Sequence, residues 1–280
     1  MHQSVTIVSI RQLYVKSSIH VALAVAAFGL ITILEFELPL SKSLLACLFF
    51  STVLSYNGIK YRHLFRLTNR PYGPELTAIG ILTILSIAGA AMSAALLKPM
   101  VLAASLIPGI LAVVYTIPLQ RRLKNLRQIY GLKIVVVGFV WAFVTVLSPF
   151  VQATEHLTPE PEMIAAFFQR FLFVVALTIP FDIRDRATDP ESLGTIPMIF
   201  GNRNAILLGV LLLAASLAIE WLFRTNSLSH TLLFVFMAIL TAGLLWKSVH
   251  RHTQNLASFW IEGIPIFWAL LLFVAAMLNL

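Results

Sequence analysis

The sequence has little charge, a single cysteine and few aspartates. Only 11% of its 280 residues are charged, whereas a soluble domain carries roughly 25%. Cys47 lies alone in an apolar run, which excludes a disulfide framework and a metal site built from cysteines. The three aspartates of the chain, Asp182, Asp185 and Asp189, all fall in one short segment. Because this residue type is otherwise missing, the segment is a candidate functional site.

Long apolar stretches take the place of the missing charge. Hydrophobic residues make up 59% of the chain, and the mean hydropathy is +0.89. A helix needs about 20 mainly apolar residues to cross the hydrocarbon core of a bilayer, and helices satisfy their own backbone groups in lipid. The stretches that meet this requirement cover residues 19–36, 40–56, 75–97, 100–118, 132–151, 163–181, 204–222, 229–246 and 258–279. We therefore predict an all-α, polytopic membrane protein of about nine transmembrane helices in a single domain, residues 1–280.

The basic residues predict the orientation of these helices. Sixteen of the 20 lie in or beside alternate connections: Arg11, Lys16, Lys60, Arg62, Arg66, Arg70, Arg121, Arg122, Lys124, Arg127, Lys133, Arg184, Arg186, Arg203, Lys247 and Arg251. The positive-inside rule places these connections and the N-terminus in the cytoplasm, and we expect the plasma (inner) membrane. The net charge of +8 then faces the membrane surface and anionic ligands, so we expect no nucleic-acid partner.

The aspartate segment has the composition of a cation site. Asp182, Asp185 and Asp189 are spaced i, i+3, i+7, which places them on one helix face if the sixth span continues that far. Pro190 disfavours helical geometry at Asp189, so we expect the helix to end there. Clustered carboxylates repel one another unless a cation lies between them, and Mg²⁺ favours carboxylates together with phosphate oxygens. Arg184 could hold the same phosphate or neutralise the acids. The alternative is a solvated charged loop.

Two cytoplasmic basic segments are candidates for binding an anionic group. The first begins with Tyr115 at the end of the fourth span and continues through Arg121, Arg122 and Lys124. The second follows the second span and contains Lys60, Arg62 and Arg66. Arginine offers bidentate contacts to phosphate, whereas ordinary anchoring at the membrane surface explains both segments equally well. Glu220 and Glu262 lie in or near spans, where a charge is either functional or at the interface.

The segment DIRDRATDPESLGTIPMIFG resembles the second aspartate-rich motif of the UbiA superfamily of intramembrane prenyltransferases. On that resemblance Asp185 and Asp189 are the motif carboxylates, and Asp182 is an extra acid one turn earlier. Tyr115 and the basic run to Lys124 resemble the family segment that helps to hold the isoprenoid diphosphate. The resemblance extends over nearly the whole chain in architecture and implies helices arranged around a central apolar cavity.

The first motif of the family departs from its pattern here. Asn57 and the segment NRPYG (69–73) resemble its frame, but the two expected aspartates fall on Tyr61 and Phe65. In the family the two motifs together hold two Mg²⁺ ions on the diphosphate, so the resemblance implies one ion here rather than two, on Asp185 and Asp189. The basic residues that could replace the missing acids as fixed cations are Lys60, Arg62, His63 and Arg66.

The resemblance implies transfer of an isoprenoid group from an isoprenyl diphosphate to a lipophilic acceptor, such as an aromatic ring or a quinone precursor, in the membrane. Asp182, Asp185 and Asp189 are then the catalytic residues. The expected substrate-binding residues are Asn57, Lys60, Arg62, Arg66, Tyr115, Arg121, Arg122, Lys124 and Arg184. The alternative is a catalytically inactive relative that binds a lipid, a quinone or a membrane partner. An alcohol phosphotransferase would need further aspartates after Asp189, and these are missing.

Overall fold

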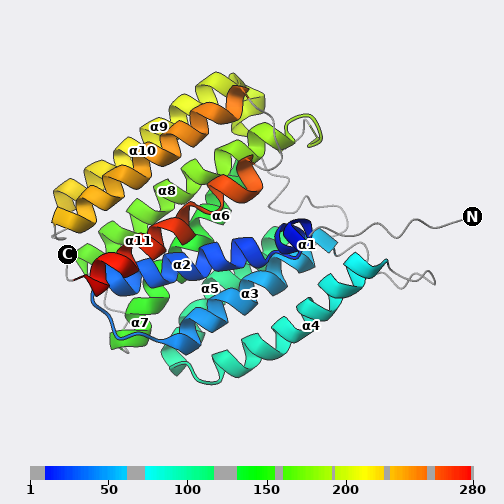
Figure 1. The fold of residues 1–280 in the computed structure, drawn as a ribbon, viewed down its shortest axis with the longest axis vertical. Coiled ribbons are helices and arrows are strands. Elements are labelled where there is room, and N and C mark those ends of the chain that lie inside the picture. The colour runs from blue at the N-terminus through cyan, green and yellow to red at the C-terminus, as the bar shows by residue number, and fades with distance from the viewer. Residues whose placement is uncertain are drawn as a thin grey trace, which may run out of the picture.

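The computed structural model describes residues 10–61, 73–116, 131–154, 160–190, 193–223, 228–250 and 256–278, which are helical and contain no strand. The helices are α1 (Ile10–Lys16), α2 (Ile19–Glu35), α3 (Lys42–Tyr61), α4 (Pro74–Ala94), α5 (Pro99–Thr116), α6 (Leu132–Ala142), η2 (Phe143–Leu147), α7 (Ser148–Thr154), α8 (Pro161–Asp185), α9 (Ile196–Phe223), α10 (Leu228–His250), η4 (Leu256–Ile261) and α11 (Ile264–Met277). Figure 1 shows the long helices running roughly side by side, with α9 and α10 along one edge and α4 along the other.

The all-α, multi-pass architecture is confirmed. Seven segments of the described chain are long and apolar enough to cross a membrane: Lys42–Tyr61, Pro74–Ala94, Leu132–Thr154, Pro161–Asp185, Ile196–Phe223, Leu228–Ser248 and Leu256–Met277. Two shorter apolar helices, Ile19–Glu35 and Pro99–Tyr115, coincide with the first and fourth predicted spans. The total of nine spans remains a prediction, because these two helices fall short of the length that the other seven reach.

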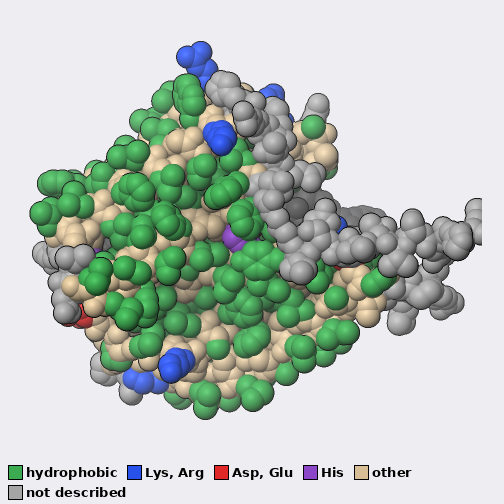
Figure 2. All heavy atoms as spheres, in the orientation of Figure 1, with side chains coloured by type: hydrophobic (Ala, Val, Ile, Leu, Met, Phe, Trp, Pro, Cys, Tyr) green, Lys and Arg blue, Asp and Glu red, His purple; other side chains and the backbone are tan. Residues whose placement is uncertain are grey.

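The outer surface of the molecule is apolar. Figure 2 shows hydrophobic side chains over most of one face, with lysine and arginine side chains near its rim. Leu96 and Leu222 are each 73% exposed, and Ile84 is 67% exposed. Soluble monomers rarely present large continuous apolar patches, so this surface suits the hydrocarbon of a bilayer.

The interior is packed by aromatic side chains around α2 and α8. Phe28, Phe173 and Trp268 are almost completely buried, and their rings meet edge-on or tilted at centroid distances of 5.5–6.2 Å. Arg170 lies among them, donating a hydrogen bond of 3.0 Å to the Phe28 carbonyl and approaching Glu35 at 4.0 Å. This arginine, which the sequence places inside a span, therefore joins α8 to α2 instead of facing lipid.

Several helices are interrupted or end early. The fifth predicted span comprises α6, the π-helical turn η2 and α7, and the last comprises η4 and α11, separated at Glu262 and Gly263. Helix α9 is broken at Gly201, whose φ of 80° suits glycine. Helix α8 ends at Asp185, one turn earlier than the expected end at Asp189. π-Helical turns occur frequently at functional sites.

Candidate active site

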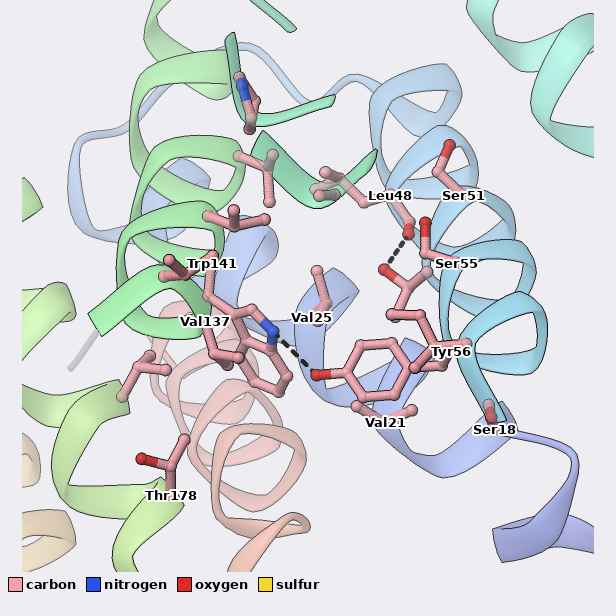
Figure 3. Close-up of a pocket in the computed structure, with 18 of the residues that line it drawn as sticks. Ser18, Val21, Val25, Leu48, Ser51, Ser55, Tyr56, Val137, Trp141 and Thr178 are labelled. Atoms are coloured by element: carbon pink, nitrogen blue, oxygen red, sulfur yellow. Dashed lines mark hydrogen bonds between the residues drawn. The ribbon is translucent and has the colours of Figure 1, made fainter. Parts of the chain in front are cut away.

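A cavity of about 660 Å³ lies between the helices. Its walls come from α2, α3, α5, α6 and α8, with the η4–α11 junction closing one side. Most of the lining is apolar, as Figure 3 shows for Val21, Val25 and Val137. Among the described residues, the charged side chains of the lining come from the ends of α3 and α8, the start of α6 and the η4–α11 junction: Lys60, Lys133, Asp182, Arg184, Asp185 and Glu262. The cavity therefore has a long apolar part and one charged end.

Lys133 joins two of the three aspartates at the charged end. Its Nζ donates a hydrogen bond of 2.7 Å to Oδ1 of Asp182 and lies 3.4 Å from Oδ2 of Asp189. Gly131, with φ of 65°, turns the chain into α6 so that Lys133 is the second residue of that helix. The Asp182 side chain is only 2% exposed, and a buried carboxylate needs such a partner because desolvation of an unpaired charge is costly.

Asp185 pairs separately with Arg184. The guanidinium donates from Nε and Nη2 to the two carboxylate oxygens of Asp185, at 2.7 and 2.8 Å. Its Nη1 donates to Oγ of Ser258 on η4, at 2.8 Å. The Arg184 and Asp185 side chains are 27% and 31% exposed, and both line the cavity. Arg184 therefore fixes Asp185 against the C-terminal span.

Glu262 brings a further carboxylate to the cavity from the break between η4 and α11. Within the described residues it forms no ion pair at 4 Å or less, and Arg184 and Lys60 are the cations whose charges act on it. Lys60 itself donates to the Lys16 carbonyl at 3.1 Å. The charged end of the cavity thus receives residues from both the N-terminal and the C-terminal parts of the chain.

A hydrogen-bonded chain fixes η4 in place. The Tyr14 hydroxyl lies 2.9 Å from Nδ1 of His20, and Nε2 of His20 lies 2.9 Å from the Phe259 carbonyl. A carbonyl only accepts, so Nε2 is the donor and Nδ1 accepts from Tyr14. Burial and the nearby Glu262 carboxylate raise the pKa of Tyr14, which keeps the hydroxyl protonated at neutral pH. This chain positions the segment that carries Ser258 and Glu262.

Two aromatic side chains bridge opposite walls of the cavity. Nε1 of Trp141 on α6 donates to the hydroxyl of Tyr56 on α3 at 3.2 Å, and Figure 3 shows the two side chains pointing toward each other. On the α3 side of this bridge, Figure 3 also shows Ser51 and Ser55 on the cavity wall. The predicted residue Tyr115 is largely buried at the end of α5 and lines the same cavity.

The structure separates the predicted site residues into three groups. Lys60, Tyr115, Asp182, Arg184 and Asp185 line the cavity, while Asp189 reaches Lys133 from beside it. Asn57 is fully buried away from the lining, where it accepts from Ser18 and donates to Thr83 and so joins α2, α3 and α4. The predicted residues that lie outside the described chain are Arg62, His63, Phe65, Arg66, Arg121, Arg122 and Lys124.

Tyr61, which stands where the first motif would have an aspartate, does not fill the cavity. The Tyr61 hydroxyl donates to the Lys16 carbonyl at 2.8 Å, and Tyr61 is outside the cavity lining. Its neighbour Lys60 lines the cavity instead. A cation therefore faces the cavity on the side where the family pattern has a carboxylate.

The aspartates carry the oxygen donors of a hard-cation site. Carboxylate oxygens are the donors that Mg²⁺ favours in proteins. Among the described residues, however, no three acidic, histidine or cysteine side chains gather as a metal site. Asp182 and Asp189 converge on Lys133, which leaves Asp185 as the second-motif carboxylate that both lines the cavity and lies away from that ammonium. Asp185 is therefore the carboxylate of this segment that could hold a divalent ion at the cavity.

These features define a multi-pass membrane protein whose apolar cavity ends in a cluster of acids and bases. The model of the UbiA prenyltransferase family matches residues 74–271. The chain belongs to this family. No curated protein sequence matches it significantly.

Solved structures with the same fold cover almost the whole chain. An apo UbiA homologue from Aeropyrum pernix K1 has a TM-score of 0.65 and 16% identity, with 92% of this chain and 98% of that chain covered. A UbiA homologue from Archaeoglobus fulgidus bound to GPP and Mg²⁺ has a TM-score of 0.60 and 15% identity, with 94% of this chain and 98% of that chain covered. A digeranylgeranylglyceryl phosphate synthase structure has a TM-score of 0.56 and 15% identity, covering 96% of both chains. At these identities the likeness shows the fold.

Sequence reasoning missed three cavity residues. In the sequence, Lys133 indicates only the orientation of the spans, because nothing local links it to an aspartate 49 positions away. The sequence places Glu262 near a span, but its position in the cavity lining depends on the break before α11. Trp141 carries no sequence signal beyond an aromatic residue in an apolar run. An alignment of charged positions inside spans is the signal that could have found the first two.

Proposed function

We propose that this protein transfers an isoprenoid group from an isoprenyl diphosphate to a lipophilic acceptor, an aromatic compound or a quinone precursor, within the plasma (inner) membrane. The main support is the distribution of side chains in the cavity, which is mostly apolar and is charged at one end. The isoprenoid tail would lie in the apolar part, and the diphosphate would bind at the charged end. Membership of a prenyltransferase family supports the same class of reaction, and one relative is a UbiA homologue bound to GPP and Mg²⁺.

In the proposed reaction the bond between C1 of the isoprenoid and the diphosphate oxygen breaks, and the electron pair leaves with the diphosphate. The acceptor then forms a bond to C1 and releases a proton. Fixed positive charge at the leaving group is the largest stabilisation that such a site can offer. Lys60 and Arg184 supply it from the cavity wall, and Ser258 and Asp185 hold Arg184 in place.

The charges that line the cavity leave room for a cation. Among the described residues, the cavity is lined by three basic side chains, Lys60, Lys133 and Arg184, and by three acidic ones, Asp182, Asp185 and Glu262. The diphosphate adds further negative charge, so a divalent ion held by Asp185 and the diphosphate would restore the balance. When bound, Mg²⁺ would withdraw electron density from the leaving oxygen. We propose one Mg²⁺ for this site, with Asp185 as the carboxylate that reaches it from the cavity wall.

Replacement of Asp185 tests the proposed function. In purified protein, Asp185→Asn should lower isoprenoid transfer by on the order of 100-fold, because it removes the cavity carboxylate proposed to hold the cation. Transfer is measured with a radiolabelled isoprenyl diphosphate and a membrane extract as the source of acceptor. The matched control is Glu75→Gln, which removes a carboxylate from the surface pair with Lys16, outside the cavity lining.

An inactive relative would behave differently. If Asp185→Asn combined with Asp189→Asn preserved full cellular function, the protein would be a binding protein of the UbiA fold and the proposed transfer would be wrong. Tyr61 donates a hydrogen bond to the Lys16 carbonyl and lies outside the cavity lining. Its side chain therefore leaves the charged end of the cavity free for a diphosphate, which supports the enzyme over the binding protein.

A further inference from the structure

We propose that the Lys133 ammonium is a built-in cation that takes the place of a metal ion between Asp182 and Asp189, so that the proposed transfer needs only one divalent ion. The inference rests on the proposed function for its role in catalysis, but the position of Lys133 is independent of it. Three observations carry the inference: the convergence of two carboxylates on Lys133, the burial of the pair, and the separate pairing of Asp185.

The convergence of carboxylates is the first observation. Oxygens of Asp182 and Asp189 lie 2.7 and 3.4 Å from the same Nζ atom. Asp182 lies in the last turn of α8, and Asp189 lies four residues beyond the end of that helix. A backbone hydrogen bond from the Asp189 amide to the Asp185 carbonyl turns Asp189 back toward the helix. Two carboxylates that face one point repel each other unless a positive charge occupies it. Here a side chain of the protein occupies it.

The burial of this pair is the second observation. The Lys133 side chain is 19% exposed and that of Asp182 is 2% exposed. Helices α6 and α8 pack directly against each other, and Gly138 lets them approach closely, because a Cβ atom there would lie 2.7 Å from a Val175 side-chain atom. The helices that carry Lys133 and Asp182 are therefore packed tightly, and a divalent ion could enter the position of the ammonium only by displacing it.

The separate pairing of Asp185 is the third observation. Both of its oxygens face Arg184 at 2.7 and 2.8 Å, and neither takes part in the Lys133 contacts. The second motif thus divides into a part bound to Lys133 and a part bound to Arg184, and Asp185 in the second part lines the cavity. This division gives a physical reason for tolerating Tyr61 and Phe65 where the family pattern has aspartates, since a site that needs one ion needs fewer carboxylates.

The test measures divalent-cation affinity and requires no turnover. Mn²⁺ binding to purified protein is followed by electron paramagnetic resonance for the wild type, Lys133→Gln and Lys98→Gln. Glutamine can still donate a hydrogen bond to Asp182 but carries no charge, so Lys133→Gln should bind Mn²⁺ at least tenfold more tightly than the wild type. Lys98 lies near Gln152 and Ala153 at the opposite end of α5, and its replacement should leave the affinity unchanged.

A second measurement separates this inference from the proposed function. Binding of geranyl diphosphate is measured in EDTA, where the wild type should retain measurable affinity and Lys133→Gln should lose at least tenfold. Lys133→Arg keeps the positive charge and should bind Mn²⁺ like the wild type, which covers the case in which the glutamine variant fails to fold. Equal or weaker Mn²⁺ binding by Lys133→Gln would overturn the role of Lys133. A wild type that binds no isoprenyl diphosphate under any condition would overturn the proposed function and leave the Mn²⁺ result standing.

Discussion

At the scale of single residues, the charged end of the cavity combines two ion-paired groups with one further acid. Lys133 holds Asp182 and Asp189, Arg184 holds Asp185, and Glu262 faces the cavity without an ion pair in the described chain. Buried charges persist in proteins when they are paired and hydrogen-bonded. The pairing therefore accounts for how a chain with so little charge keeps these acids and bases together inside a membrane.

Glu262 gives a prediction at this scale. When the Glu262 carboxyl is ionised, its negative charge opposes a diphosphate that Lys60 and Arg184 attract. In alkaline buffer, Glu262→Gln should therefore strengthen isoprenyl diphosphate binding by roughly 1–2 kcal/mol, as expected for charges several ångströms apart at intermediate polarity. Isothermal titration of geranyl diphosphate into detergent-solubilised protein measures the effect, with Glu75→Gln as the matched loss of charge. Weaker binding by Glu262→Gln would mean that the carboxylate contacts the ligand or its cation directly.

At the scale of the helices, the apolar stretches predicted the architecture closely but not the interruptions. The predicted span 132–151 matches the described segment 132–154, and 229–246 matches 228–248, since length and hydropathy are decided locally. The break at Gly201 and the π-helical turns η2 and η4 were missed, because they depend on neighbouring helices. The predicted single helical face for the three aspartates was wrong, because α8 ends at Asp185. Asp182 and Asp189 nevertheless meet at Lys133, while Asp185 pairs with Arg184.

The close packing of α6 and α8 yields a second prediction. Gly138→Ala places a methyl group 2.7 Å from a side-chain atom of Val175, and such overpacking costs about 1–3 kcal/mol. Because α6 carries Lys133 and α8 carries Asp182, the variant should both unfold at a lower temperature and bind Mn²⁺ differently from the wild type. Thermal unfolding in detergent measures the first effect.

The control for this variant lies on α4. A Cβ atom at Gly80 would meet nothing within 4 Å, so Gly80→Ala should leave the unfolding temperature unchanged or slightly raise it, as alanine favours helix. If Gly138→Ala were as stable as Gly80→Ala, the contact between α6 and α8 would be less tight than the structure describes, and packing would not hold Lys133 in place.

At the scale of the whole molecule, the orientation in the membrane follows from the basic residues and stays a prediction. The charged end of the cavity lies where the predicted cytoplasmic connections begin, at the ends of α3 and α8 and the start of α6. The opposite connection, between α4 and α5, contains Lys98. An isoprenyl diphosphate made in the cytoplasm would then reach the charged end directly, while its tail enters from the membrane.

Cysteine labelling tests this orientation. In a Cys47→Ala background, Ala187→Cys should react with a membrane-impermeant maleimide only after cells are opened. Lys98→Cys should react in intact cells from which the outer barrier has been removed, because positive-inside topology places it outside. Ala187 is exposed in the turn after α8, so the reagent can reach it once it crosses the membrane. The reverse pattern would invert the proposed topology and place the charged end of the cavity outside.

The hydrogen bond between Tyr56 and Trp141 makes the fluorescence of Trp141 a measure of cavity occupation. Trp141 lines the cavity and donates a hydrogen bond to the Tyr56 hydroxyl on the opposite wall. A ligand that enters between the two side chains would therefore change both the hydrogen bond of the Trp141 indole and the polarity around it. The other tryptophans are placed differently: Trp221, Trp246 and Trp260 are 72%, 59% and 59% exposed on the outer surface, and Trp268 is 1% exposed in the aromatic interior. Occupation of the cavity should therefore be visible in the intrinsic emission of one tryptophan, without any label.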